Sequence, residues 1–211
     1  MGKYINNNRT AIFGGTFDPP HKGHFKLATS IINDDYADKV LFVPAFQAPH
    51  KVGIESSAFL HRKNMLQLAL NALGNSKFSL SDIEYRRRPA ESYTFETLTE
   101  LSRLNPCQQY ILLIGADNLF TFHLWYNASE LLNTWDILTY PRRGFEDLST
   151  IFEHWDKCTA DKLCSSLLPY PFFDISSTEI RQHLKEKKNI HSELLSETFE
   201  YIKQNNLYGI N

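Results

Sequence analysis

TAIFGGTFDPPHKGH, residues 10–24, joins a short apolar run to two adjacent glycines, an Asp-Pro-Pro turn and two histidines three positions apart. The run at 10–15 is rich in β-branched and aromatic residues, which predicts a strand. Apolar residues then recur at helical spacing between 25 and 32, and a second β-rich run follows at 39–44. A strand, a helix and a strand in this order predict a βαβ unit with parallel strands and a right-handed crossover.

The same alternation continues along the chain. Further helical periodicity covers 66–73, 95–104 and the tail from residue 192. Further candidate strands lie at 77–85, 110–115, 136–140 and 171–175. The run at 110–115 is the most continuously apolar, which predicts a central strand buried on both faces. We therefore expect a Rossmann-like α/β fold in one domain over residues 1–211, with a doubly wound, mostly parallel sheet and helices on both faces.

Composition places the chain among soluble globular proteins. Of its 211 residues, 42% are hydrophobic and 22% are charged, and the formal net charge of −2 argues against a nucleic-acid-binding surface. No apolar run reaches the length of a membrane span, and the first residues lack the apolar stretch of a signal peptide, so we expect a cytoplasmic protein. Three cysteines without C-x-x-C spacing predict buried free thiols rather than a disulfide framework or a zinc site.

Unusual residues follow four of the predicted strands. They are Gly14-Gly15, the segment 44–51, Gly115-Ala116-Asp117 and Ser176-Ser177-Thr178. In a doubly wound sheet, ligands bind outside the carboxyl ends of the strands, so these segments are expected to meet at one site. Each has a simpler explanation when taken alone, because glycines form turns and Ser176 with Glu179 can cap a helix. Their convergence on one edge favours a binding site.

The residue types in the opening stretch suit an anion. Gly14 and Gly15 let a ligand approach the main chain without a Cβ in the way. Two prolines keep the chain extended after Asp18, so a helix can begin only near His21. His21 and His24 then share the first turn, where free N–H groups favour a phosphate. The alternatives are that the histidines only cap or pack the helix, or that they bind zinc, for which no further ligand stands at a matching spacing.

The motif His21-Lys22-Gly23-His24, with GGTFDPPH before it and ISSTEIR at 175–181, resembles the HIGH-motif nucleotidyltransferases. Within that superfamily the chain is similar to the bacterial nicotinate mononucleotide adenylyltransferases. Four middle segments carry this narrower resemblance, namely APHK at 48–51, HRKNML at 61–66, SYTFETL at 92–98 and GADNLFTFHLW at 115–125. The similarity covers most of the chain, and the paired end motifs are its most specific part.

The resemblance implies a single nucleotidyltransferase domain that transfers the adenylyl group of ATP to nicotinate mononucleotide in NAD biosynthesis. The expected products are deamido-NAD and pyrophosphate, formed by in-line displacement without a covalent intermediate. The implied catalytic residues are His21, His24 and Arg181. The implied ATP-binding residues are Gly14, Gly15, Thr16, Phe17, Gly115, Asp117, Ser176, Ser177 and Thr178. Mg²⁺ is expected to arrive with ATP, because the sequence shows no acidic cluster and hence no metal site of its own.

For the second substrate, the resemblance places the nicotinate ring against Trp125 and its carboxylate on main-chain groups near Thr94 and Tyr126. Lys51 and Arg142 are implied for the mononucleotide phosphate. A core role for Trp125 and a solvated Lys51 stay open as alternatives. Two departures from the family pattern are visible: residues 141–144 read PRRG where R-P-G is usual, which makes Arg143 the rival of Arg142, and position 48 is Ala where Asn is usual.

The expected partners are ATP and nicotinate mononucleotide, with neither nucleic acid nor membrane, and a homo-oligomer is left open. Competing enzyme activities are a dual-specificity or nicotinamide mononucleotide adenylyltransferase, a phosphopantetheine adenylyltransferase and a cytidylyltransferase for a small alcohol phosphate. A catalytically silent nucleotide-binding module is the rival from another class. An intact histidine pair and end-motif arginine disfavour it.

Overall fold

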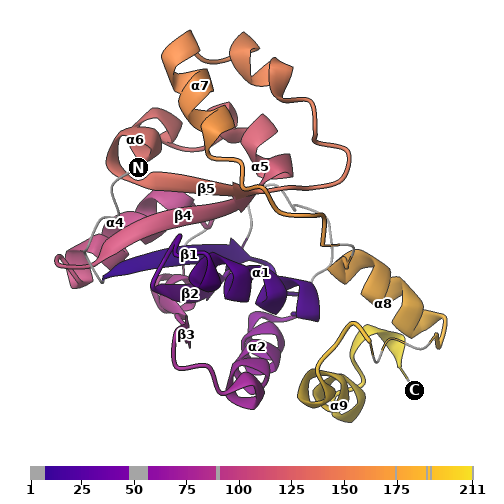
Figure 1. Ribbon diagram of the computed structural model, residues 1–211. Coiled ribbons are helices and arrows are strands. Elements are labelled where there is room, and N and C mark those ends of the chain that lie inside the picture. The colour runs from indigo at the N-terminus through magenta and orange to yellow at the C-terminus, as the bar shows by residue number, and fades with distance from the viewer. Residues whose placement is uncertain are drawn as a thin grey trace.

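A five-stranded parallel sheet forms the centre of the computed structural model, which describes residues 8–47, 57–88, 91–173, 175–188, 190 and 192–210. The strand order is β3-β2-β1-β4-β5 (Figure 1). The strands are β1 (Arg9–Gly15), β2 (Lys39–Pro44), β3 (Phe78–Leu80), β4 (Gln109–Gly115) and β5 (Asp136–Tyr140). The sheet grows from β1 in both directions, so the winding reverses between β1 and β4, where a ligand site is expected.

Helices pack on both faces because successive strand residues point to opposite sides. Ala11 and Phe13 of β1 join one buried cluster, and Ile12 joins the other. The first cluster includes α1 (Lys22–Asn33) and α2 (Phe59–Leu73). The second includes α3 (Ile83–Arg87), α4 (Thr94–Leu104), α5 (Ala116–Phe120), η2 (Phe122–Leu124), α6 (Ala128–Thr134), η3 (Leu148–Glu153) and α7 (Lys157–Ser165). The predicted doubly wound fold is confirmed.

A third buried cluster brings the C-terminal segment back to the start of the fold. It joins Met65 of α2 to apolar residues of α8 (Ser177–Lys185) and α9 (Ser196–Gln204). The short turn η4 (Leu207–Gly209) packs against this cluster. In Figure 1, α8 and α9 lie at the lower right, on the side to which the strand arrows point. The last part of the chain is therefore placed near the loop that follows β1.

The predicted strand at 77–85 is wrong in its second half. Only Phe78–Leu80 pairs with the sheet, and Ile83–Arg87 forms the helix α3. Ile83 and Glu84 are both buried, whereas a strand would send adjacent side chains to opposite faces. The local alternation of polar and apolar residues therefore overstated the length of this edge strand.

The predicted strand at 171–175 is also wrong. The described residues of this segment make no sheet ladder, and pairing beside β5 is limited to a parallel bridge between Thr139 and Leu167. Pro169 and Pro171 have no N–H to donate to a ladder, so the chain leaves the sheet edge and crosses toward α8. The strand at 110–115 is buried as expected, although β1 is the middle strand.

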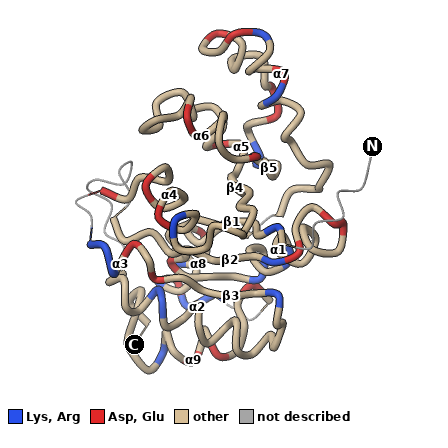
Figure 2. Tube along the Cα trace, turned by 90° about the vertical axis from the view of Figure 1, so that its left-hand side faces the viewer, with Lys and Arg blue, Asp and Glu red and all other residues tan. Residues whose placement is uncertain are grey.

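Charge distribution, helix hydrophobicity and cysteine exposure can each be compared with what the composition predicted. Basic and acidic residues are interspersed along the described part of the trace in this view (Figure 2). None of the helices in the described segments has the length and apolarity needed to cross a membrane. The three cysteines are free, but Cys107 and Cys158 are exposed, so the prediction that they are buried is wrong. Both lie in polar segments at the ends of elements, where no core is available to cover them.

Candidate active site

A cavity of about 930 Å³ opens at the carboxyl ends of β1, β4 and β5. Its walls also include the starts of α1, α4 and α8. Every site residue expected from the sequence lines it, apart from Lys51, which lies outside the described residues. These residues are Gly14, Gly15, Thr16, Phe17, His21, His24, Thr94, Gly115, Asp117, Trp125, Tyr126, Arg142, Ser176, Ser177, Thr178 and Arg181. The volume is at the upper end of the range for small-molecule sites.

The two histidines form one stacked unit at the start of α1. His21 is the N-cap, and its ring lies 3.6 Å from that of His24 with an interplanar angle of 26°. The backbone N–H of His21 donates to Nδ1 of His24 at 3.1 Å. This bond places the proton of a neutral His24 on Nε2, which leaves that atom as its hydrogen-bond donor.

Both imidazoles are neutral at pH 7. Burial lowers the pKa of His21 to about 3, with a further contribution from the positive charge of Arg142. Burial, followed by His21 and Arg142, holds the pKa of His24 well below its usual value. Each ring therefore offers one N–H donor, and a bound polyanion would favour the charged forms by supplying the opposite charge.

The helix α8 is fastened to the β1–α1 loop, which we define as residues 16–21. Arg181 Nη1 donates to the backbone oxygen of Asp18 at 2.7 Å, and Ser177 Oγ donates to that of Pro19 at 2.9 Å. Ser176 caps α8 as predicted, accepting from the backbone N–H of Glu179 at 3.1 Å. The first and last motifs of the sequence are thus joined directly, with the starts of α1 and α8 beside one cavity.

The wall formed by β4 and β5 carries a charged pair. Arg142 Nε lies 3.5 Å from Asp117 Oδ1, and its guanidinium stands 5.3 Å from the centre of the Tyr140 ring. A Cβ at Gly115 would displace the Asp117 carboxylate, so glycine lets this carboxylate lie against the backbone here. Arg143 instead lies over the ring of Phe172, at 5.6 Å.

Aromatic side chains form the opposite end of the cavity. Trp125 is half-buried, packs against Phe122 at 5.0 Å between ring centres, and also lines the cavity. It therefore packs against a buried aromatic ring and also borders the cavity. Tyr126 is exposed and lies 4.9 Å from the ring of Tyr93, which is the N-cap of α4. Thr94 is the first residue of that helix, so its N–H has no partner within α4.

Buried polar atoms without a hydrogen-bond partner gather at this cavity. Among the described residues seven side-chain atoms are of this kind, and four of them belong to cavity residues: His21 Nδ1, Asp117 Oδ1, Trp125 Nε1 and Arg142 Nε. Unpaired buried donors and acceptors are costly and are concentrated at functional sites. Of these four atoms, Asp117 Oδ1 and Arg142 Nε face each other as an ion pair, which leaves His21 Nδ1 and Trp125 Nε1, and the placement of these two at the cavity indicates a ligand site.

Comparison with known proteins gives the family. Residues 12–183 match the family model described as cytidylyltransferase-like. The nicotinate-nucleotide adenylyltransferase of Bacillus subtilis is 33% identical over 200 residues, which cover 95% of this chain and 98% of that protein. The chain belongs to the nicotinate-nucleotide adenylyltransferase family. The probable nicotinate-nucleotide adenylyltransferase of Thermomicrobium roseum is 35% identical, with 95% of this chain and 92% of that protein covered.

A solved structure agrees in fold with this member of the nicotinate-nucleotide adenylyltransferase family. Plasmodium falciparum nicotinic acid mononucleotide adenylyltransferase complexed with NaAD superposes with a TM-score of 0.76 at 23% identity, covering 97% of this chain and 98% of that one. The same enzyme complexed with APC gives a TM-score of 0.74 at 22% identity and equal coverage. These likenesses confirm the Rossmann-like architecture.

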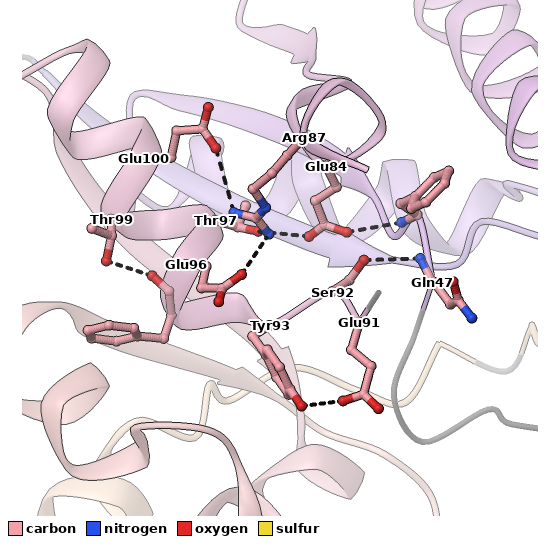
Figure 3. A network of polar contacts seen from close by, with 12 residues as sticks. Gln47, Glu84, Arg87, Glu91, Ser92, Tyr93, Glu96, Thr97, Thr99 and Glu100 are labelled. Atoms are coloured by element: carbon pink, nitrogen blue, oxygen red, sulfur yellow. Dashed lines mark hydrogen bonds and ion pairs between the residues drawn. The ribbon is translucent and has the colours of Figure 1, made fainter. Parts of the chain in front are cut away.

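Glu84 is a buried carboxylate that the sequence analysis missed, and it holds the helix α4 that begins at Thr94. Glu84 lines the cavity and accepts from the backbone N–H of Phe46 at 3.0 Å and from the hydroxyl of Thr97 at 2.9 Å (Figure 3). Arg87 Nη2 donates in turn to the same Thr97 oxygen at 3.2 Å. Glu84 was hidden in the segment taken for a strand, so only its burial beside a cavity could have revealed it.

A second missed residue, Arg62, connects three loops at the carboxyl edge. Its side chain is 2% exposed and donates to the backbone oxygens of Thr16 and Ala45, both at 2.8 Å, and of Ser57 at 3.0 Å. Burial lowers its pKa, and nearby acidic groups partly offset this effect. The planar fork of donors suits this bracket better than a lysine would. Its presence in HRKNML was a signal only through the family resemblance.

The network around Glu84 yields a stability prediction. Thr97→Val removes the hydroxyl but keeps the side-chain shape, which leaves a buried carboxylate oxygen and Arg87 each without one partner. The free energy of unfolding should fall by about 1–3 kcal/mol, measured by urea denaturation. Thr99→Val is the matched control, because its hydroxyl bonds only to the backbone of Phe95 at an exposed position. Equal losses in both variants would contradict a special role for the Glu84–Thr97 bond.

Proposed function

We propose that the protein transfers the adenylyl group of ATP to nicotinate mononucleotide, giving deamido-NAD and pyrophosphate in NAD biosynthesis. The observation that carries this proposal is the composition of one cavity, which has a histidine pair and Arg181 at one end and Trp125 beside the start of α4 at the other. The first end suits phosphates, and the second suits an aromatic ring that bears an anion. The names of the curated relatives support the same reaction.

Catalysis then requires positioning and charge neutralisation rather than a base. The phosphate of the mononucleotide is already ionised near neutral pH and can attack the α-phosphorus of ATP in line, with pyrophosphate leaving from the opposite side. His24 and His21 donate to the oxygens on which charge develops, at the start of α1. Arg181 and the start of α8 hold the β- and γ-phosphates.

The remaining ATP contacts follow from the same edge of the sheet. Gly14 has open space where a Cβ would stand, so a nucleotide can approach the backbone closely. Asp117 presents a carboxylate to the ribose. The other residues proposed for ATP are Gly15, Thr16, Phe17, Gly115, Ser176, Ser177 and Thr178, all of which line the cavity.

We propose that the divalent cation is Mg²⁺ and that it arrives bound to ATP. No group of three or more His, Cys, Asp or Glu side chains in the described segments could hold a metal ion. Asp117 fits a supporting role, because its Oδ1 is buried and lacks a hydrogen-bond partner there. When bound, the cation offsets negative charge on the phosphates and keeps mostly phosphate and water ligands.

The pyridine end recognises the acid through main-chain donors. Thr94 is the first residue of the eleven-residue helix α4, so its N–H is available to a ligand. The helix dipole also favours a carboxylate at this end. Tyr126 lies beside this helix start through its contact with Tyr93. Trp125 offers a ring face for stacking, and Arg142, with Lys51 outside the described residues, is proposed for the mononucleotide phosphate.

We also infer that residues 1–211 act as one domain, because α8 and the β1–α1 loop hold each other across the cavity. The reaction needs only the two small substrates as partners, neither nucleic acid nor membrane, and is assigned to the cytoplasm. The oligomeric state does not enter this proposal.

Replacing each histidine tests the phosphate end. His21→Ala and His24→Ala should each lower kcat at least about a hundredfold, because each removes a donor aimed at transition-state charge. Pyrophosphate release measures turnover, and circular dichroism checks that the fold is kept. His61→Ala is the control, since His61 lies on α2 and contacts Tyr201 instead. Unchanged turnover in either of the first two variants would return the histidines to a capping role.

Trp125→Ala tests the ring-binding end. We expect a higher KM for nicotinate mononucleotide, because the lost stacking should weaken its binding free energy by about 1–3 kcal/mol, as for bases stacked on aromatic side chains. KM for ATP should stay within a few-fold. Trp135→Ala is the control, because Trp135 packs against the same buried cluster without lining the cavity. If both KM values stay constant while the melting temperature falls as in the control, Trp125 is a core residue only.

Competing the acid against the amide tests substrate choice. A carboxylate only accepts hydrogen bonds, whereas a carboxamide between main-chain donors near Thr94 and Tyr126 would have to turn its NH₂ toward one of them. Thus kcat/KM for nicotinate mononucleotide should exceed that for nicotinamide mononucleotide at least about a hundredfold, or about 2.7 kcal/mol. Equal efficiencies would indicate a dual-specificity enzyme. A preference for pantetheine phosphate would show that the second substrate is not a pyridine nucleotide.

A further inference from the structure

A buried hydrogen bond joins the C-terminal turn to the β1–α1 loop. Asp18 is 3% exposed, and its Oδ1 accepts from the hydroxyl of Tyr208 at 2.5 Å. The other carboxylate oxygen of Asp18 accepts from the backbone N–H of Ser57 at 3.1 Å. The backbone carbonyl oxygen of Asp18 accepts from Arg181 Nη1. One residue of the loop thus receives donors from three distant parts of the chain.

We propose that Tyr208 is a positioning residue for adenylyl transfer, acting through Asp18 to hold the β1–α1 loop, which includes His21, and His24 in the first turn of α1. This inference rests on the proposed function. Neither residue needs to touch the reacting atoms. Asp18 stands three positions before His21 and also anchors Arg181, so a shift of this loop would misplace both phosphate-binding groups together. Small misplacements of catalytic groups are costly to rate.

The surroundings of Tyr208 indicate a specific constraint. Its backbone has φ of 58°, in the left-handed region that residues with a Cβ rarely adopt. Such conformations persist only where the surrounding contacts impose them. Burial and the neighbouring Asp18 raise the pKa of Tyr208, so the hydroxyl stays protonated and remains a donor.

Arg62 connects the carboxylate of Asp18 to a larger hydrogen-bond network. The Arg62 guanidinium donates to the backbone oxygens of Thr16 and Ser57, on either side of the Asp18 side chain. Asp18 is thus a buried charge beside a buried opposite charge, and loss of one donor leaves it incompletely paired. Removal of the Tyr208 hydroxyl should therefore move the loop rather than only weaken one contact.

The rival explanation is packing, because Tyr208 belongs to the third buried cluster and lies 4.0 Å from Met65 Sδ. Tyr208→Phe separates the two roles, since it keeps the ring and removes only the hydroxyl. Tyr201→Phe is the matched control: its hydroxyl pairs with Asn64 and His61 in the same layer but contacts nothing in the β1–α1 loop.

The experiment measures steady-state turnover of ATP with nicotinate mononucleotide, well below the melting temperature of each variant. Tyr208→Phe should lower kcat at least about tenfold with KM for nicotinate mononucleotide within twofold, because the pyridine end is built on α4. Tyr201→Phe should keep kcat within twofold. Asp18→Asn should also lower kcat, and the double variant with Tyr208→Phe should be no worse than about the poorer single one, since both act through one bond.

Two results would overturn the inference alone: wild-type kcat in Tyr208→Phe, or equal kcat losses in Tyr208→Phe and Tyr201→Phe. Fully additive losses in the double variant would also contradict it. If the wild-type protein forms no deamido-NAD, the proposed function fails first and takes this inference with it. The wild-type assay therefore distinguishes the two failures.

Discussion

The backbone carbonyl of Asp18 is the acceptor at which the two ends of the chain meet. Arg181 donates to it from α8, and Ser177 of the same helix donates to the carbonyl of the next residue, Pro19. A parallel sheet leaves its carboxyl-end loops without ladder partners, so their buried carbonyls need donors from elsewhere. The return of the C-terminal segment across this edge supplies them, and the position of the histidines depends on it.

The same constraint explains the electrostatics of the site. A loop held this tightly buries two imidazoles beside Arg142, and the cost of charging them there keeps both neutral. Neutral rings and the start of α8 together form a site suited to anions. A chain with a formal net charge of −2 can therefore bind two polyanionic substrates through local features.

The two ends of the cavity are supported by two networks that meet in the loop after β2, where Arg62 donates to Ala45 and Phe46 donates to Glu84. Asp18, Arg62 and Tyr208 support the end with the histidines, whereas Glu84, Thr97 and Arg87 connect the loop after β2 to α4. Each network contains a buried carboxylate with donors from at least two elements. Buried polar networks of this kind specify one arrangement when fully satisfied.

Local spacing in the sequence determined the βαβ start, the doubly wound class and the placement of His21 at a helix start. The rule that ligands bind at carboxyl ends brought segments as distant as Gly14 and Gly115 to one expected site, and the cavity unites them. Ser176 lines the same cavity although no strand precedes it, because α8 is held to the β1–α1 loop by Ser177 and Arg181. Only the tertiary structure decided that residues 83–87 are helical, that 171–175 leaves the sheet, and that Glu84, Arg62 and Tyr208 support the site. The Asp18–Tyr208 bond spans 190 residues, and no periodicity encodes such a contact, because it forms only after the hydrophobic clusters have set the relative positions of the elements.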